Sequence, residues 1–217
     1  MKTQSFQHLT SAEKVILGLR TAITTGALPA GAQIRQEEIA TQYAVSRMPV
    51  REAFRQLEAE GLVVVYPGRG AFVNRLSDNE IAEIYDIRIL LEGDALRRAV
   101  PLLTPAMLAE AEELLAQLSQ AQDGQTFGKL DAAFHATLYA PAQRPRLLEL
   151  INTLRNQVTQ FLYAASPMQS YRASAIPEHR QILDACYAGN VEQAVKAIEM
   201  HLRNSVNIVI GASLHHK

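Results

Sequence analysis

The 217-residue chain has little cysteine and no long apolar run, and each shortage excludes a class of protein. Cys186 is the only cysteine, so the chain cannot form an internal disulfide or a zinc cluster built from several cysteines. No apolar stretch approaches the ~20 residues that a membrane-spanning helix needs. Residues 1–14 lack the apolar core of a secretory signal. We therefore expect a cytoplasmic protein with no membrane segment.

The composition indicates a folded chain with two unlike parts. Hydrophobic residues make up 48% of the sequence, which is enough to fill a core and excludes wholesale disorder. The net charge of -1 hides an uneven distribution. Nine Lys and Arg stand against six Asp and Glu through Leu76, whereas the remainder has twelve against sixteen. A basic N-terminal part followed by an acidic remainder favours two domains, over residues 1–76 and 77–217.

The N-terminal part has the pattern of three helices followed by a β-hairpin, which is the layout of a winged helix-turn-helix. Thr10 and Glu13 form a capping-box pattern that begins the first helix. Ser46 is a good N-cap for the third helix, and Gly61 stands where a glycine commonly ends one. We expect helices over residues 10–26, 35–42 and 46–61, and strands over 62–66 and 71–74 around the turn PGRG.

The third of these helices presents a basic face. Arg47, Arg51 and Arg55 follow one another at intervals of four, so all three lie on the same side. A helix that presents arginine can enter the major groove of DNA, where the guanidinium pairs with O6 and N7 of guanine. The alternative is a solvated face whose arginines pair with Glu52 or Glu58.

The tip of the expected hairpin favours the DNA-binding interpretation. Arg69 stands between Gly68 and Gly70, and glycines leave no side chain to keep a positive charge away from a phosphate backbone. Arginines on a helix and at a hairpin tip are both suited to contacting double-stranded DNA.

Three segments resemble the GntR-type bacterial transcription regulators. Residues 44–63, AVSRMPVREAFRQLEAEGLV, closely resemble the recognition-helix signature of that family. Residues 67–73, PGRGAFV, resemble the wing, and residues 26–34, GALPAGAQI, resemble the link between the first two helices. The resemblance implies that Arg47 and Arg51 contact bases or flanking phosphates, and that Gly70 lets the wing approach the backbone. Met48 stands where the family usually has threonine.

From Ser77 onward the sequence has only helical patterns, so we expect a mainly α protein that ends in an all-α antiparallel bundle. The expected helices cover residues 77–100, 104–122, 128–139, 146–164, 176–187 and 191–210.

Four polar residues in the bundle form a candidate metal site. Asp131 and His135 are four apart on one expected helix, and His179 and His201 lie on two others. An aspartate with three imidazoles suits zinc, nickel or another divalent first-row ion. The alternative for each histidine taken singly is an ordinary core or boundary residue. The four can converge only if the bundle brings the three helices together.

The C-terminal part resembles the FCD ligand-binding domain of the FadR subgroup of GntR regulators. The similar segments are residues 84–96, 130–139 and 177–202, which read IYDIRILLEGDAL, LDAAFHATLY and PEHRQILDACYAGNVEQAVKAIEMHL. In the metal-containing members, an aspartate, the histidine four residues later and two further histidines bind a metal in the centre of the bundle. This resemblance implies a metal at Asp131, His135, His179 and His201, with zinc as the first choice and nickel or manganese as alternatives.

Arg88 is the candidate for binding an effector. A guanidinium can bind a carboxylate through two parallel hydrogen bonds, and the resemblance implies that an arginine at this position faces the pocket. The alternative is a surface ion pair with Glu92, which follows four residues later. Arg155, Asn156 and Tyr163 are further candidates for lining the same pocket.

We therefore predict a homodimeric transcription regulator, a repressor, that binds a pseudo-palindromic DNA operator and responds to a small carboxylate metabolite. The rival is a metal-dependent enzyme of the helical-bundle type with an accessory DNA-binding domain. It is weakened because the sequence lacks an adjacent His–Asp pair and the Glu-x-x-His pairs of di-iron bundles. Glu178 adjoins His179, but neighbours on a helix point about 100° apart. A third interpretation gives the metal a purely structural role.

Overall fold

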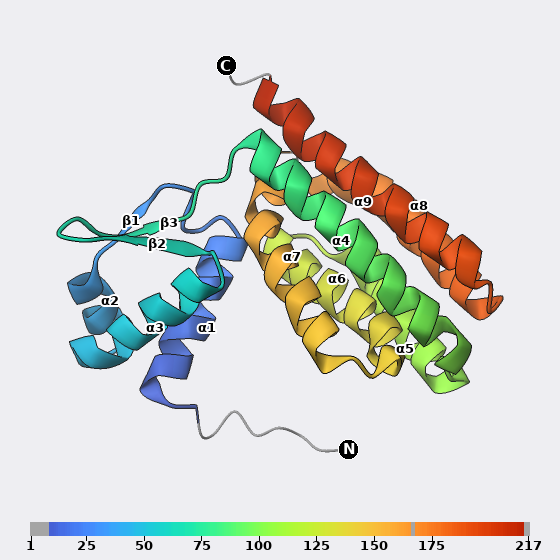
Figure 1. Cartoon of the computed structure of the whole chain (residues 1–217), viewed down its shortest axis with the longest axis horizontal. Coiled ribbons are helices and arrows are strands. Elements are labelled where there is room, and N and C mark those ends of the chain that lie inside the picture. The colour runs from blue at the N-terminus through green and yellow to red at the C-terminus, as the bar shows by residue number, and fades with distance from the viewer. Residues whose placement is uncertain (1–8, 166–167, 215–217) are drawn as a thin grey trace. The chain divides into compact units, whose positions relative to one another are not determined.

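The computed structural model describes residues 9–165 and 168–214 (Figure 1). The chain divides into two compact units, residues 1–75 and residues 76–217. Each unit has its own hydrophobic core, and each is described by itself.

The first unit contains three helices and a small sheet. Its elements are α1 (Ser11–Thr24), β1 (Gln33–Ile34), α2 (Gln36–Gln42), α3 (Arg47–Ala59), β2 (Val63–Tyr66) and β3 (Gly70–Val73). The strands are antiparallel in the order β1-β3-β2, and Val63 pairs with Val73. The winged helix-turn-helix layout is thus confirmed. The strand β1 was not predicted, because two residues are too few to show an alternating pattern.

Local signals set the ends of these helices. The Thr10 N–H donates to Glu13 Oε2 at 2.7 Å and the Glu13 N–H donates to Thr10 Oγ1 at 3.2 Å, so the predicted capping box is confirmed. Gly61 follows α3 with φ +72, the left-handed conformation that glycine adopts without strain. Buried side chains of α1 and α3, including Leu19 and Leu57, form the core under the sheet.

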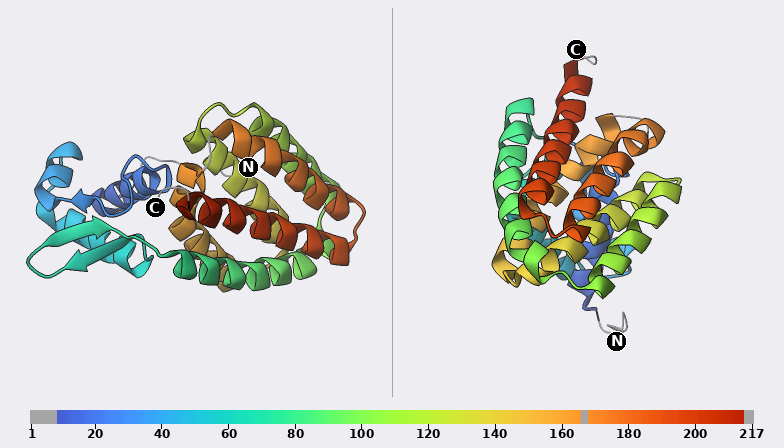
Figure 2. Two further views of the ribbon diagram at one scale, coloured as in Figure 1. Left: turned by 90° about the horizontal axis from the view of Figure 1, so that it is seen from above. Right: turned by 90° about the vertical axis from the view of Figure 1, so that its right-hand side faces the viewer.

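The second unit is a bundle of helices that run side by side (Figure 2). Its helices are α4 (Asp78–Ala99), α5 (Pro105–Gln120), α6 (Gly124–Tyr139), α7 (Pro145–Ala165), α8 (Met168–Tyr187) and α9 (Val191–Leu214). Helix α9 packs against α4, α7 and α8, and α5 packs against α6 and α8. No helix in the described ranges is both long and apolar enough to cross a bilayer.

The predicted start of helix α8 at residue 176 is wrong, because the helix begins at Met168. Pro177 lies inside it and removes the hydrogen bond to the carbonyl of Ala173. Both residues are on the exposed side of the helix, where water can satisfy that carbonyl. Tyr171 and Ala175 are buried in the bundle core, and this packing holds the turns before the proline.

We predict that Leu138→Ala, in α6, lowers the free energy of unfolding by about 2–5 kcal/mol, because Leu138 is fully buried and its loss leaves a cavity. Urea unfolding followed by circular dichroism at 222 nm measures the change. The matched control is Leu102→Ala, since the Leu102 side chain is 55% exposed. Equal effects of the two substitutions would contradict the assignment of Leu138 to the core.

Candidate metal centre and nucleic-acid interface

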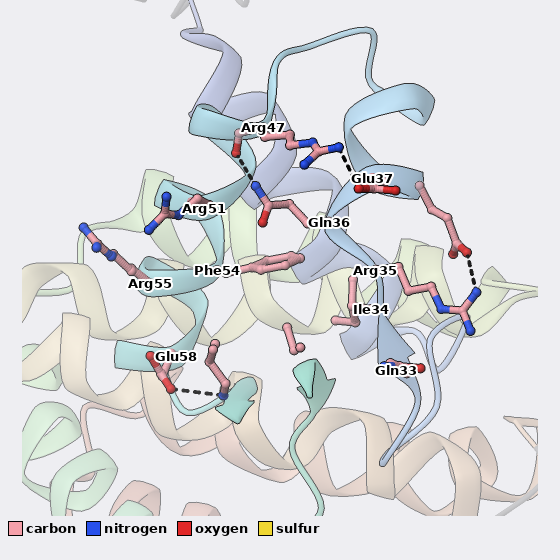
Figure 3. A pocket seen from close by; sticks show the side chains of 14 residues that line it. Gln33, Ile34, Arg35, Gln36, Glu37, Arg47, Arg51, Phe54, Arg55 and Glu58 are labelled. Carbon is pink, nitrogen blue, oxygen red and sulfur yellow. Dashed lines mark hydrogen bonds and ion pairs between the residues drawn. The ribbon is translucent and has the colours of Figure 1, made fainter. Parts of the chain in front are cut away.

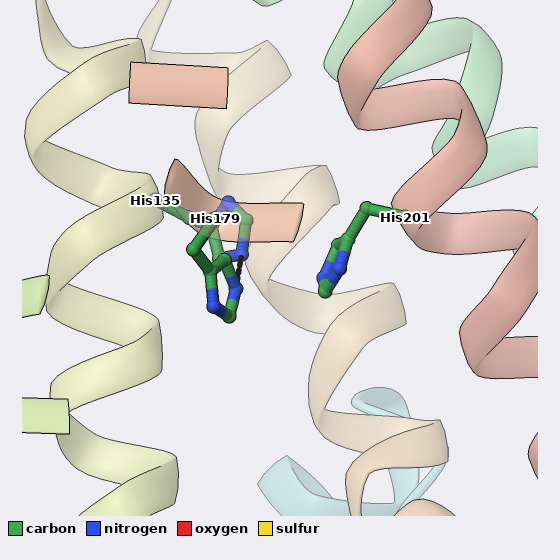
Figure 4. Close-up of side chains that lie close together, drawn as sticks. All are labelled: His135, His179 and His201. Carbon is green, nitrogen blue, oxygen red and sulfur yellow. Dashed lines mark hydrogen bonds between the residues drawn. The ribbon is translucent and has the colours of Figure 1, made fainter. Parts of the chain in front are cut away.

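Three histidines converge inside the second unit. His135 comes from α6, His179 from α8 and His201 from α9, and their rings point toward one another (Figure 4). One ligand atom from each lies within 4.8 Å of the others, and Nε2 of His135 is 3.2 Å from Nε2 of His179. All three side chains are buried. The structure thus brings together three of the four residues predicted to hold a metal.

The fourth predicted residue, Asp131, joins the cluster through one oxygen. Its Oδ1 lies 3.0 Å from Nε2 of His179 and 3.7 Å from Nε2 of His135. Neither approach has the geometry of a hydrogen bond, so Oδ1 is buried without a hydrogen-bond partner among the described residues. The other oxygen, Oδ2, accepts a hydrogen bond from Arg155. An unpaired buried carboxylate oxygen beside imidazole nitrogens is the arrangement that a metal ion would satisfy.

The protonation states of these groups also fit a cation. Burial lowers the pKa of His135 well below its ordinary value, and burial likewise lowers the pKa of His179. Burial by itself would raise the pKa of Asp131, but the positive charge of Arg155 outweighs this effect and the pKa lies well below its ordinary value. His135 and His179 are therefore neutral and Asp131 is ionised, which are the states that metal ligands require.

The outer nitrogens of two of these histidines have partners that the sequence analysis did not identify. Nδ1 of His201 lies 2.7 Å from Oε2 of Glu178, and Nδ1 of His135 lies 3.2 Å from the Tyr139 hydroxyl. Tyr139 stands four residues after His135, so helical spacing could have indicated that contact. Glu178 is adjacent to His179 in the sequence, and nothing local shows that it contacts His201 instead.

Arg88 forms the ion pair with Glu92 that was the alternative to an effector-binding role, but the pair is buried instead of lying on the surface. Nε of Arg88 lies 2.8 Å from Oε1 of Glu92, and the two side chains are 7% and 1% exposed. The Tyr139 hydroxyl donates to the other oxygen of Glu92 at 2.7 Å. Burial would lower the pKa of Arg88, but the charge of Glu92 raises it, so the guanidinium stays positive.

Two cavities adjoin this network. The first, of about 20 Å³, is lined by Arg88, Arg155 and the metal-site residues Asp131, His135 and His201, among others. The second, of about 80 Å³, shares His135 and Arg155 with the first. Asn156 does not line either cavity, and the Tyr163 side chain lies outside the described residues. The first cavity has room for about one water molecule or ion.

The three arginines of α3, together with Arg35, lie around a groove of about 670 Å³ between α3 and the β1–α2 segment (Figure 3). Arg51 and Arg55 are exposed, and within the described part of the chain they form no ion pair. Arg47 pairs with Glu37 of α2 at 2.7 Å. The alternative partner Glu58 instead accepts the Val65 N–H at 3.1 Å. Two of the three helical arginines are therefore available to a ligand.

The β2–β3 turn presents Arg69 to solvent. Gly68 and Gly70 have φ values of +73 and +92, so a side chain at either position would strain the backbone. Gln33 Nε2 donates to the Arg69 carbonyl at 3.0 Å, which ties the turn to β1. Glycine at these positions thus allows both the tight turn and an unobstructed approach to a ligand.

Known proteins match both units. Residues 11–73 match the family model described as bacterial regulatory proteins, gntR family, and residues 83–204 match the FCD domain. A protein of Paenarthrobacter nicotinovorans, described as a "probable D-xylose utilization operon transcriptional repressor", is 34% identical over 83% of this chain and 80% of its own length. The repressor RspR of Escherichia coli K12 is 28% identical over 85% of this chain and 82% of its own.

A solved structure, E. coli McbR/YncC, has the same architecture. It matches with a TM-score of 0.85 and 28% identity, over 94% of this chain and 99% of that one. These similar proteins are transcription regulators and not enzymes, so the rival interpretation as a metal-dependent enzyme is set aside.

We predict that Glu92→Ala lowers the free energy of unfolding by about 3–5 kcal/mol, because it leaves the Arg88 charge buried and unpaired. Urea unfolding in the presence of a chelator measures this loss separately from any effect of metal.

The same helix offers a matched control for this change. Asp94 and Arg98 form a second i,i+4 ion pair on α4 at 2.8 Å, with side chains 41% and 44% exposed. Asp94→Ala should leave the urea midpoint nearly unchanged, since exposed pairs contribute little. A loss as large as that of Glu92→Ala would show that burial is not what makes the Arg88–Glu92 pair important.

Proposed function

This chain belongs to the gntR family of bacterial regulatory proteins and carries an FCD domain, and we propose that it is a repressor whose affinity for DNA is set by a small carboxylate bound beside a metal ion. The observation that carries the proposal is the meeting of two features around one cavity. The unpaired Oδ1 of Asp131 and the histidine nitrogens offer metal ligands, and Arg88 offers a positive charge.

We propose that α3 enters the major groove and that the β2–β3 turn lies along the phosphate backbone. Arg51 and Arg55 are exposed and able to pair with guanine or phosphate, and Arg69 is exposed at the turn. Arg47 would exchange its pairing with Glu37 for a contact with DNA. Met48 is 59% exposed on the same helix and offers an apolar contact where the family usually has threonine. Two copies of the domain in a homodimer would read a pseudo-palindromic operator.

The metal proposed for the bundle is a divalent transition ion held by Asp131, His135, His179 and His201. Two or three nitrogen ligands with a carboxylate are typical of zinc, and nickel and manganese are the alternatives. When bound, the ion would supply a positive centre for one end of an anionic ligand. The four ligand residues would hold the ion, and Arg88 would orient the carboxylate of the ligand.

The proposed response rests on the size of the cavity. The cavity of about 20 Å³ beside Arg88 is too small to hold an organic acid. The ligand would therefore bind a state in which this cavity has opened toward the neighbouring cavity of about 80 Å³. A ligand that binds the widened state better shifts the population toward it. A carboxylate on Arg88 would compete with Glu92, and Tyr139 links Glu92 to His135. The Arg88 side of the site and the metal side are thereby coupled.

We predict that Arg51→Ala abolishes tight binding to the operator. The substitution removes an exposed guanidinium from the helix that is proposed to enter the major groove of DNA. Fluorescence anisotropy of labelled DNA from upstream of the chain's own gene measures the binding, with unrelated duplex as competitor at two salt concentrations. A contact with phosphate alone would instead weaken binding to all sequences and reduce the salt slope by about one.

The control for this experiment is Arg98→Ala, which removes an exposed arginine from the second unit. It should bind DNA as the unchanged protein does. If Arg51→Ala also binds normally, while the unchanged protein binds the duplex tightly and specifically, α3 is not the reading helix.

We further predict that the metal and the carboxylate act together. A panel of small organic acids, added to the same anisotropy assay, should contain one that lowers DNA affinity. Chelation should abolish that response, and so should His179→Ala, because His179 is a proposed ligand. Asp184→Asn, an exposed acid on the same helix α8, is the control and should respond normally.

Chelation distinguishes this proposal from a purely structural metal. If chelator unfolds the bundle, as judged by circular dichroism, and the ligand response is unchanged in whatever protein remains folded, the metal serves stability alone. If the response to the acid persists in chelator with the bundle intact, the ligand does not require the metal, and that part of the proposal fails.

A further inference from the structure

Glu178 links the last two helices of the bundle, α8 and α9, beside His201. Its carboxylate lies on α8, and its two oxygens each contact a residue of α9. Oε2 lies 2.7 Å from Nδ1 of His201, and Oε1 accepts a hydrogen bond from Nδ2 of Asn204 at 2.7 Å. The Glu178 side chain is only 18% exposed and that of His201 is 4% exposed, so solvent competes little for these bonds.

This contact determines which nitrogen of His201 faces the cluster. An ionised carboxylate can only accept hydrogen bonds, so Nδ1 of His201 carries the proton that bonds to Glu178. A neutral imidazole carries a single N–H, and its Nε2 is then a bare acceptor directed away from Glu178. The His201 ring lies 4.6 Å from the His179 ring and 5.5 Å from the His135 ring, between centroids.

The three histidines differ in the partner of the outer nitrogen. For His135 the partner is the neutral hydroxyl of Tyr139, and Nδ1 of His179 has no hydrogen-bond partner among the described residues. Of the three, His201 alone has a carboxylate from the described part of the chain at that nitrogen. A carboxylate on the outer N–H of a ligating histidine orients the ring and makes the inner nitrogen a stronger donor to a metal.

We infer that Glu178 is a positioning residue for the metal, which it would serve by holding His201 in the Nδ1–H form, and that Asn204 holds Glu178 in place. The inference rests on the metal site of the proposed function. Glu178 is not one of the four proposed ligands. It is adjacent to His179 in the sequence, but its side chain contacts His201.

The test measures Co²⁺ affinity of the full chain by competition with a chelator, using the visible absorbance of the bound ion. Glu178→Ala should bind Co²⁺ about 10–100-fold more weakly than the unchanged protein. Glu178→Gln should lose less, because an amide oxygen can still accept from Nδ1–H. Asn204→Ala should also lose less, because the carboxylate remains.

A matched control removes the charge of a partly exposed glutamate. Glu112 pairs with Arg180 of α8, and both side chains are 41% exposed. Glu112→Gln should leave Co²⁺ affinity unchanged. A melting temperature measured for every variant in excess chelator separates a loss of metal affinity from a general loss of stability.

A second readout follows the tautomer directly. Two-dimensional ¹H–¹⁵N spectra of the metal-free imidazoles should show His201 with its proton on Nδ1 in the unchanged protein, and a shift toward the Nε2–H form in Glu178→Ala. A purely structural role for Glu178 would not change the tautomer in a variant that remains folded.

The outcomes separate this inference from the proposal on which it rests. If the unchanged protein binds no Co²⁺, the metal site itself is wrong and the role of Glu178 falls with it. If the unchanged protein binds Co²⁺ and folded Glu178→Ala binds it equally tightly, only the role of Glu178 is overturned. A folded variant with weaker binding and a changed tautomer supports the inference.

Discussion

The bundle depends on the mutual neutralisation of charges that it buries. Arg88 and Glu92 form one pair, and Asp131 and Arg155 form another, all within the same interior. A charge removed from water is costly unless a partner of opposite sign and sufficient hydrogen bonds replace the solvent. Helices α4, α6 and α7 must therefore present these groups to one another while their apolar residues fill the rest of the core.

This constraint explains why the pKa values of His135 and His179 are lowered. Once Arg155 has satisfied one oxygen of Asp131, the other oxygen is left beside the imidazole nitrogens of His135 and His179. Additional positive charge on buried imidazoles would be unfavourable, and burial keeps His135 and His179 unprotonated because it lowers the pKa of each. The site therefore offers lone pairs of nitrogen and oxygen to a cation. Hydrogen bonds among the described residues do not satisfy all of its donors and acceptors.

The two units solve opposite electrostatic problems. The bundle buries charged side chains in pairs, whereas the first unit leaves Arg51, Arg55 and Arg69 exposed to solvent. Exposed arginines cost little in stability, and the field of several together attracts a polyanion. GntR-family regulators bind DNA operators, and the proposed function assigns this surface to that ligand. Each unit has its own core.

The sequence by itself determined the features that depend on neighbours along the chain. The capping box at Thr10 and the one-sided arrangement of Arg47, Arg51 and Arg55 follow from local spacing alone. The pairing of Asp131 with His135 on one face also follows, because helical periodicity is a property of a short segment.

Only the tertiary structure decided which helices face one another. Helical spacing gives the direction of a side chain about its own axis but does not say what stands opposite, so it could not show that Glu178 contacts His201 or that Arg47 pairs with Glu37. The same reason explains the early start of α8. The buried packing of Tyr171 outweighs the local penalty of Pro177, and that packing exists only once the bundle has formed.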